Sequence, residues 1–144
     1  MNQPETVSLL QEIYQNARTA VEAIETLLSK SSASQFTASL KSQASRYREI
    51  AKSAAAQLGG FRELPAENPI FDRIGLWASL QMGTLTNHAP GHMAEIIING
   101  STAGIVSLTK RLHAAPQTDP AAKALAHDLL DTEQQTIRLM GSFL

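Results

Sequence analysis

Apolar residues recur every three or four positions along almost the whole chain, a spacing that places them on one face of an α-helix. The repeat is long over about residues 5–29 and 34–58, where the apolar side chains form one wide stripe on each expected helix. A shorter repeat covers about 69–86, and two more long ones cover 90–113 and 120–144. No alternating segment is long enough to predict a strand. The pattern therefore predicts an all-α protein.

Turn and cap residues separate these repeats. The Gly-Gly pair at 59–60 is expected to end the second helix, because glycine reaches the left-handed conformation that helix ends often require. Asn-Pro at 68–69, Pro90 and Asp-Pro at 119–120 match an N-cap or a first-turn proline and are expected to begin the last three helices. Gly104, one turn after another glycine, is expected to let a second backbone approach closely.

The predicted architecture is one domain, residues 1–144, built from two long helical hairpins over about 5–58 and 90–143 with a crossover helix over about 69–86. The connection between the hairpins is long enough to run from one end of a bundle to the other. This arrangement resembles the ferritin-like superfamily. The segment TLTNHAPGHMAEIIINGSTAGI, followed by an acidic last helix, also resembles small uncharacterised bacterial proteins assigned that up-down bundle fold.

The resemblance implies a di-iron site, which takes one inward Glu from each of two helices and a Glu-x-x-His pair from each of the other two. This chain lacks most of these ligands. No histidine precedes position 88, and none of the nine glutamates has His three residues later. In the first helix, Glu12, Glu22 and Glu25 are predicted to point away from the apolar stripe.

Glu133 is the exception, because it projects near the middle of the apolar face of the last helix, with Thr136 where a di-iron enzyme would have its histidine. A carboxyl in an apolar core is expensive unless it finds hydrogen-bond donors or takes up a proton. Tyr47 and Gln81 are the predicted donors from two other helices. We therefore predict a buried polar cluster of Tyr47, Gln81 and Glu133, which either fixes the helix register or binds a ligand; a bundle end where Glu133 reaches water is a further alternative.

A second constellation lies at the start of the fourth predicted helix. His92 and Glu95 are one turn apart, and His88 precedes them in the loop. Two imidazoles and a carboxylate match an open zinc site. However, His92, Glu95, Asn99 and further polar residues also form the narrow polar arc of this helix, as a solvated edge would. The string NHAPGHMAEI additionally resembles part of the DinB-like metal-binding bundles, a family that needs a third histidine from an earlier helix.

Composition narrows the function classes. The formal net charge is −1 with both signs dispersed, so nucleic acid and anionic membrane are not expected partners. There is no cysteine, which excludes disulfides and thiolate chemistry. No apolar run reaches the length of a membrane span, and the first ten residues lack the pattern of a signal peptide. We expect a cytoplasmic protein.

Two functions remain open. In the first, the protein is a non-catalytic helical bundle that acts through self-association or a protein partner. The isoleucines at 96–98 give the fourth helix more apolar surface than one neighbour covers, and Trp77 offers a further contact. In the second, it is a ferritin-like bundle that binds a divalent metal or a small ligand at a degenerate site. No cofactor is required by the first function.

Overall fold

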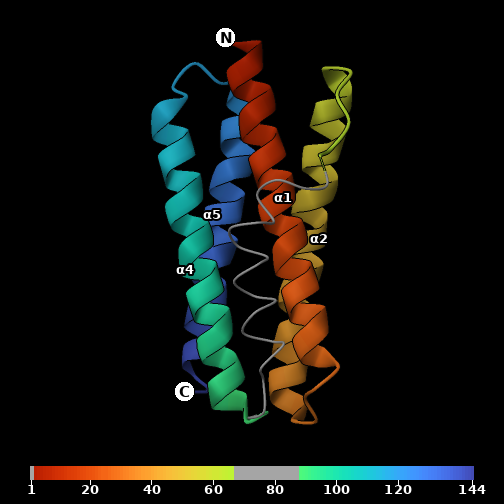
Figure 1. The fold of residues 1–144 in the computed structure, drawn as a ribbon, viewed down its shortest axis with the longest axis vertical. Coiled ribbons are helices and arrows are strands. Elements are labelled where there is room, and N and C mark those ends of the chain that lie inside the picture. The colour runs from red at the N-terminus through yellow and green to blue at the C-terminus, as the bar shows by residue number, and fades with distance from the viewer. Residues whose placement is uncertain (1, 67–87) are drawn as a thin grey trace.

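The computed structural model describes residues 2–66 and 88–144, which form four α-helices and no strand. These are α1 (Gln3–Leu28), α2 (Ser34–Gly60), α4 (Pro90–Ala114) and α5 (Pro120–Gly141). The helices lie side by side as a bundle (Figure 1). The prediction of an all-α bundle is confirmed, whereas the crossover helix expected over residues 69–86 falls outside the described residues.

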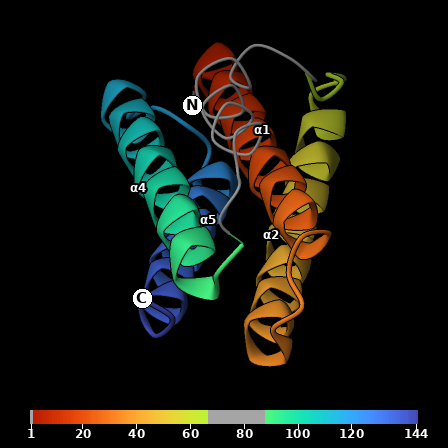
Figure 2. The same ribbon diagram turned by 60° about the horizontal axis from the view of Figure 1, so that its bottom comes forward.

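The bundle consists of two antiparallel hairpins, α1 with α2 and α4 with α5 (Figures 1 and 2). The hairpins meet where α2 packs on α5 and α1 packs on α4, while α1 also touches α5. Because α2 ends at the end of the bundle where α1 begins, and α4 starts at the opposite end, α2 and α4 run in the same direction. The two hairpins predicted from the sequence are therefore confirmed.

Local signals position three of the helix starts, and those of α4 and α5 were expected from the sequence. Asn2 caps α1 by accepting a hydrogen bond from the backbone N–H of Glu5 at 3.1 Å. Asp119 caps α5 in the same way, accepting from Ala121 at 3.3 Å, and Pro90 occupies the first turn of α4. The Gly-Gly pair ends α2 as expected, with Gly60 as its last residue, but the expectation of a left-handed glycine was wrong, because neither glycine has a positive φ. The left-handed residue that follows is Arg62, with φ of 60°.

The core is continuous along the bundle, and α1 contributes most to it. Its middle turns are buried on nearly all sides, because α1 contacts α2, α4 and α5. At one end of the bundle the rings of Phe36 and Phe143 pack edge to face, with their centroids 5.2 Å apart. Burial along three interfaces explains why α1 tolerates few exposed positions between residues 9 and 21.

Two loops are fastened to α1. After α2 the chain crosses the middle of α1, where Gln11 donates to the carbonyl of Leu64 at 2.9 Å and Gln15 donates to that of Ala66 at 3.0 Å. At the other loop, the N–H of Asp119 donates to the hydroxyl of Thr6 at 2.9 Å, which ties the α4–α5 turn to the first turn of α1. These bonds fix both loops against the bundle.

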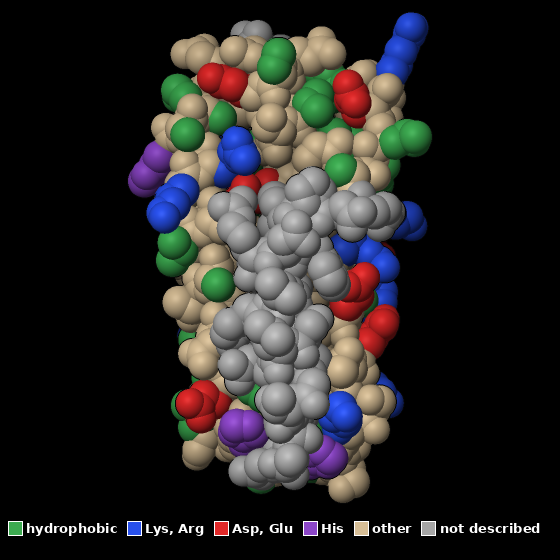
Figure 3. Space-filling view, viewed as in Figure 1, with side chains coloured by type: hydrophobic (Ala, Val, Ile, Leu, Met, Phe, Trp, Pro, Cys, Tyr) green, Lys and Arg blue, Asp and Glu red, His purple; other side chains and the backbone are tan. Residues whose placement is uncertain are grey.

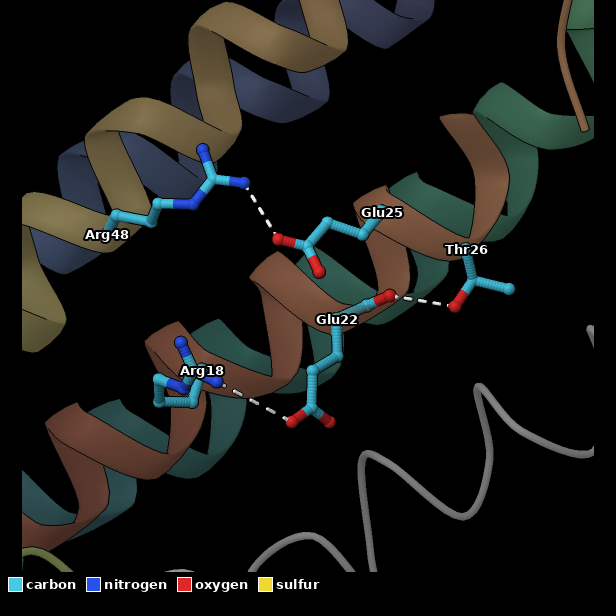
Figure 4. Close-up of polar contacts among 5 residues, drawn as sticks. All are labelled: Arg18, Glu22, Glu25, Thr26 and Arg48. Atoms are coloured by element: carbon cyan, nitrogen blue, oxygen red, sulfur yellow. Dashed lines mark hydrogen bonds and ion pairs between the residues drawn. The ribbon is translucent and has the colours of Figure 1, made fainter. Parts of the chain in front are cut away.

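The outward surface carries charges of both signs, which are intermixed over the described part of the face in Figure 3. On the α1–α2 hairpin, Arg48 of α2 pairs with Glu25 of α1 at 2.8 Å, and Arg18 reaches Glu22 at 3.9 Å (Figure 4). All four side chains are substantially exposed, so each pair contributes at most about 1 kcal/mol. No helix in the described ranges combines the length and hydropathy needed to cross a membrane.

Candidate functional site

A cluster of buried polar side chains occupies the middle of the bundle and draws on all four described helices. We call it the central polar cluster. Its members are Asn16 of α1, Gln43 and Tyr47 of α2, Ser101 of α4, and Glu133 and Thr136 of α5. Every one of them is at least nine-tenths buried.

Glu133 and Tyr47 lie together at the centre of this cluster. Glu133 is 4% exposed and Tyr47 is 1% exposed, and the Tyr47 hydroxyl donates a hydrogen bond to Oε1 of Glu133. The structure therefore brings together two of the three residues that the sequence placed in a buried cluster. The third, Gln81, lies outside the described residues. The alternative that Glu133 reaches water at a bundle end is wrong.

Thr136 extends the network away from the carboxyl. Its Oγ1 lies 2.8 Å from the Tyr47 hydroxyl and accepts a hydrogen bond from Nε2 of Gln43 at 2.7 Å. Thr136 in turn donates to the backbone carbonyl of Thr132, one helical turn earlier, at 2.9 Å. Gln43 was not identified from the sequence, although its position one turn before Tyr47 on α2 was a usable signal.

Burial controls the protonation of the cluster. Loss of solvent raises the pKa of the Glu133 carboxyl from 4.5 to about 8, although hydrogen bonds from Tyr47 and Ser101 act to lower it. Burial, followed by the neighbouring Glu133 charge, also raises the pKa of Tyr47 well above its usual value of 10.0. At neutral pH both groups are therefore predominantly uncharged, which avoids the large cost of a charge in the core.

Gly104 of α4 provides the space for this carboxyl. A methyl group at position 104 would lie 2.2 Å from Oε2 of Glu133 and 3.4 Å from Oδ1 of Asn16. The sequence predicted that Gly104 admits a neighbouring backbone. The nearest group is instead the Glu133 side chain. Gly104 therefore makes room for a side chain, and the prediction of a backbone there was wrong.

One polar group of the cluster has no partner among the described residues. Asn16 is 4% exposed, and its Nδ2 donor makes no hydrogen bond there. Its Oδ1 lies close to the same point on α4, at Gly104, as Oε2 of Glu133. A buried amide donor without a partner usually costs about 1–3 kcal/mol unless a water or another polar group satisfies it.

Glu12 is a second buried carboxylate, and its predicted outward orientation was wrong. It is 2% exposed and faces α4, where Ser107 donates to it at 3.2 Å and Arg111 donates at 3.3 Å. Glu22 and Glu25 are exposed, as expected. Glu12 also forms part of the wall of an open groove of about 620 Å³ between α1 and the outward side of α4.

The residues of the predicted zinc site lie at the start of α4. His88 and Glu95 are exposed and His92 is partly buried. Within 2–66 and 88–144, no group of three or more His, Cys, Asp or Glu side chains is arranged to hold a metal ion. Metal binding by His88, His92 and Glu95 stays a prediction from the sequence.

The geometry allows limited chemistry at the bundle centre. Glu133 is the carboxyl of the cluster, it is protonated at neutral pH, and its Oε1 is already bonded to Tyr47. The remaining members are amides and hydroxyls. Such groups can hold a proton, a water or a hard cation, whereas the imidazole and second carboxylate of a di-iron pair are not among the described members of the cluster.

No family model matches this chain, and no curated protein matches it either. Among solved structures, it is similar to the crystal structure of a DUF305 fragment from Deinococcus radiodurans, with a TM-score of 0.77 and 19% sequence identity. The match covers 97% of this chain and 95% of the other. At this identity the likeness shows the fold alone, an all-helical bundle.

Proposed function

We propose that this protein is a non-catalytic helical bundle that acts by association, with itself or with a protein partner, through the outward face of α4. The observation that carries the proposal is the groove of about 620 Å³ beside this face. Val106, which lines the groove, is 48% exposed and is one of three large hydrophobic side chains exposed in the described residues. An exposed apolar side chain beside a groove favours a contact with another molecule.

The surface differs from the one expected from the sequence. Ile96 and Ile97 are 4% and 6% exposed, so they pack within this chain and are unavailable to a partner. Trp77 lies outside the described residues. The exposed part of α4 is instead the polar arc together with Ala103 and Val106.

The interior supports a structural role for the central polar cluster. Tyr47 donates a hydrogen bond to Glu133 and its hydroxyl lies 2.8 Å from that of Thr136, while the raised pKa keeps the carboxyl neutral. A neutral cluster whose members bond to one another fixes helix register more readily than it activates a substrate. The two-hairpin arrangement, with α2 and α4 running in the same direction, also supports assigning the fold to the ferritin-like group, whose members need not share a function.

A second candidate function is the binding of a small polar ligand or a divalent metal at the central polar cluster. It is favoured by one observation, the partnerless Nδ2 of Asn16 beside Glu133. The carboxyl, amide and hydroxyl oxygens of the cluster are ligand types that hard cations take. Binding of a cation there would require Glu133 to lose its proton.

Elemental analysis of the purified protein, combined with light scattering over a range of protein concentrations, tests the two functions together. A metal-free protein whose mass exceeds that of one chain supports association. A monomer with a stoichiometric transition metal contradicts it. Glu133→Gln and His92→Ala then serve as matched variants, because loss of metal in the first assigns it to the bundle centre and loss in the second assigns it to the start of α4.

A further inference from the structure

The exposed residues of α4 form a single stripe. Between positions 95 and 110 they are Glu95, Asn99, Thr102, Ala103, Val106 and Lys110. Residues three or four apart in a helix share a face, so these six side chains follow one line along the outside of α4. We call this line the α4 stripe. The helix that carries it, α4, lies at one side of the bundle in Figures 1 and 2.

The α4 stripe has the same spacing when it is read in either direction. Its centre lies midway between Thr102 and Ala103, with Asn99 and Val106 equally far from that point on opposite sides. Glu95 and Lys110 are also equally far from it, at the two ends. A two-fold axis through this point would pair each position with its counterpart in a second copy.

We propose that the α4 stripe is the interface of a homodimer, in which two copies pair their α4 helices antiparallel about this axis. The proposal rests on the proposed function of association and names the partner as a second copy of the chain. Closed two-fold interfaces use the same patch on both subunits, which is the property that the α4 stripe has.

Charge complementarity favours this register. Antiparallel pairing places Glu95 of each copy opposite Lys110 of the other, so opposite charges meet at both ends of the stripe. Among the described residues, neither Glu95 nor Lys110 forms an ion pair within the chain. A parallel arrangement in register would place like charges opposite each other, which is unfavourable.

The shapes of the side chains also fit a close helix pair. Thr102 and Ala103 lie at the axis, where small side chains let two helices approach to about 8–10 Å. Val106 of each copy faces Asn99 of the other and gains cover for its exposed surface. The groove is lined by five of the six stripe residues and by Glu12, Ser107, Arg111 and Ala114, so it offers space beside the crossing for the side chains of the second copy.

Charge reversal tests the pairing directly. Glu95→Lys and Lys110→Glu each convert both end pairs into repulsive ones, and each is expected to weaken dimerisation by about tenfold in sedimentation at low salt. An equimolar mixture of the two variants should restore an affinity near wild type, because both end pairs are again of opposite sign in the mixed dimer. A single chain that carries both Glu95→Lys and Lys110→Glu should also dimerise with an affinity near wild type, because its end pairs are again of opposite sign.

Matched controls are available on α2, where Glu49 and Lys41 are also exposed. Glu49→Lys and Lys41→Glu change the same charges and should leave the dimer unaffected. The absence of cysteine allows a second readout, since Ala103→Cys should form a disulfide-linked dimer on oxidation and the exposed Ala124→Cys of α5 should not.

The outcomes separate this inference from the proposed function. A wild-type dimer that neither charge reversal weakens would overturn the α4 interface and leave association in place. A wild-type protein that stays monomeric at every concentration would overturn the homodimer and, with it, self-association. Weakening in both single variants without recovery in their mixture would overturn the antiparallel register.

Discussion

Replacing Glu133 by glutamine isolates the effect of burying an ionisable group at the bundle centre. Glutamine has nearly the shape of a protonated carboxyl, and its amide oxygen can accept the hydrogen bond from Tyr47. It cannot release a proton. The free energy of unfolding of Glu133→Gln should therefore lack the pH dependence that Glu133 gives to the wild type.

The magnitude follows from the raised pKa of Glu133, about 8 in the folded protein against 4.5 for the ordinary group. Between these values the folded state holds a proton that the unfolded state has lost. The stabilisation from this proton is complete below pH 4.5 and decreases as pH rises to about 8. The loss is about 1.4 kcal/mol per pH unit, or about 5 kcal/mol in all.

Urea unfolding of the two proteins across this pH interval provides the assay. The difference in unfolding free energy between wild type and Glu133→Gln removes the contribution of groups common to both. As the pH rises across this interval, we expect the unfolding free energy of Glu133→Gln to increase by about 5 kcal/mol relative to that of the wild type. A difference that stays constant would refute the reasoning, because it would mean that Glu133 titrates alike in the folded and unfolded states.

Three further substitutions test the contacts around the two buried carboxyls. Gly104→Ala should destabilise the wild type by about 1–3 kcal/mol, because the new methyl displaces the Glu133 carboxyl from its hydrogen bond. In a Glu133→Ala background the same change should stabilise by up to about 1 kcal/mol through helix propensity, and equal effects in both backgrounds under urea unfolding would contradict this contact. Tyr47→Phe should cost about 1–3 kcal/mol of unfolding free energy. The hydrogen bond from Tyr47 lowers the pKa of Glu133, so its removal should raise that pKa and move the upper end of the pH dependence of stability to higher pH in the same assay. Arg111→Met should cost about 1–3 kcal/mol of unfolding free energy, because it leaves Glu12 without its charged partner. Chemical denaturation should show a smaller cost in a Glu12→Gln background, and an equal cost in both backgrounds would mean that the pair contributes nothing.

The sequence predicted the described helices and the hairpins because these depend on local signals. Apolar spacing gives the helical faces, while Pro90 and Asp119 mark helix starts that the structure confirms. The inward position of Glu133 followed from the same periodicity, since a helix face is fixed by the residues one turn away. Tyr47 was identified as its partner because it was the polar side chain central on the face of α2.

Glu12 could not be placed in this way, for a physical reason. Periodicity locates the strongest apolar face of a helix but does not give the number of its neighbours. Because α1 is covered by three helices, positions beside its apolar stripe are also buried, and Glu12 meets Arg111 and Ser107 across the α1–α4 interface. The partner of such a residue lies almost a hundred positions away in the chain, beyond the range of any local pattern.

The fit between Gly104 and Glu133 shows how this bundle accommodates a lone carboxyl. The glycine supplies volume on α4, Tyr47 supplies a donor on α2, and the raised pKa removes the charge. A shift of α5 by one helical turn, about 5.4 Å, would separate the Glu133 carboxyl from both Gly104 and Tyr47. Apolar stripes alone would permit several registers of α5, and the fit of the carboxyl between the glycine and the tyrosine therefore favours the observed one.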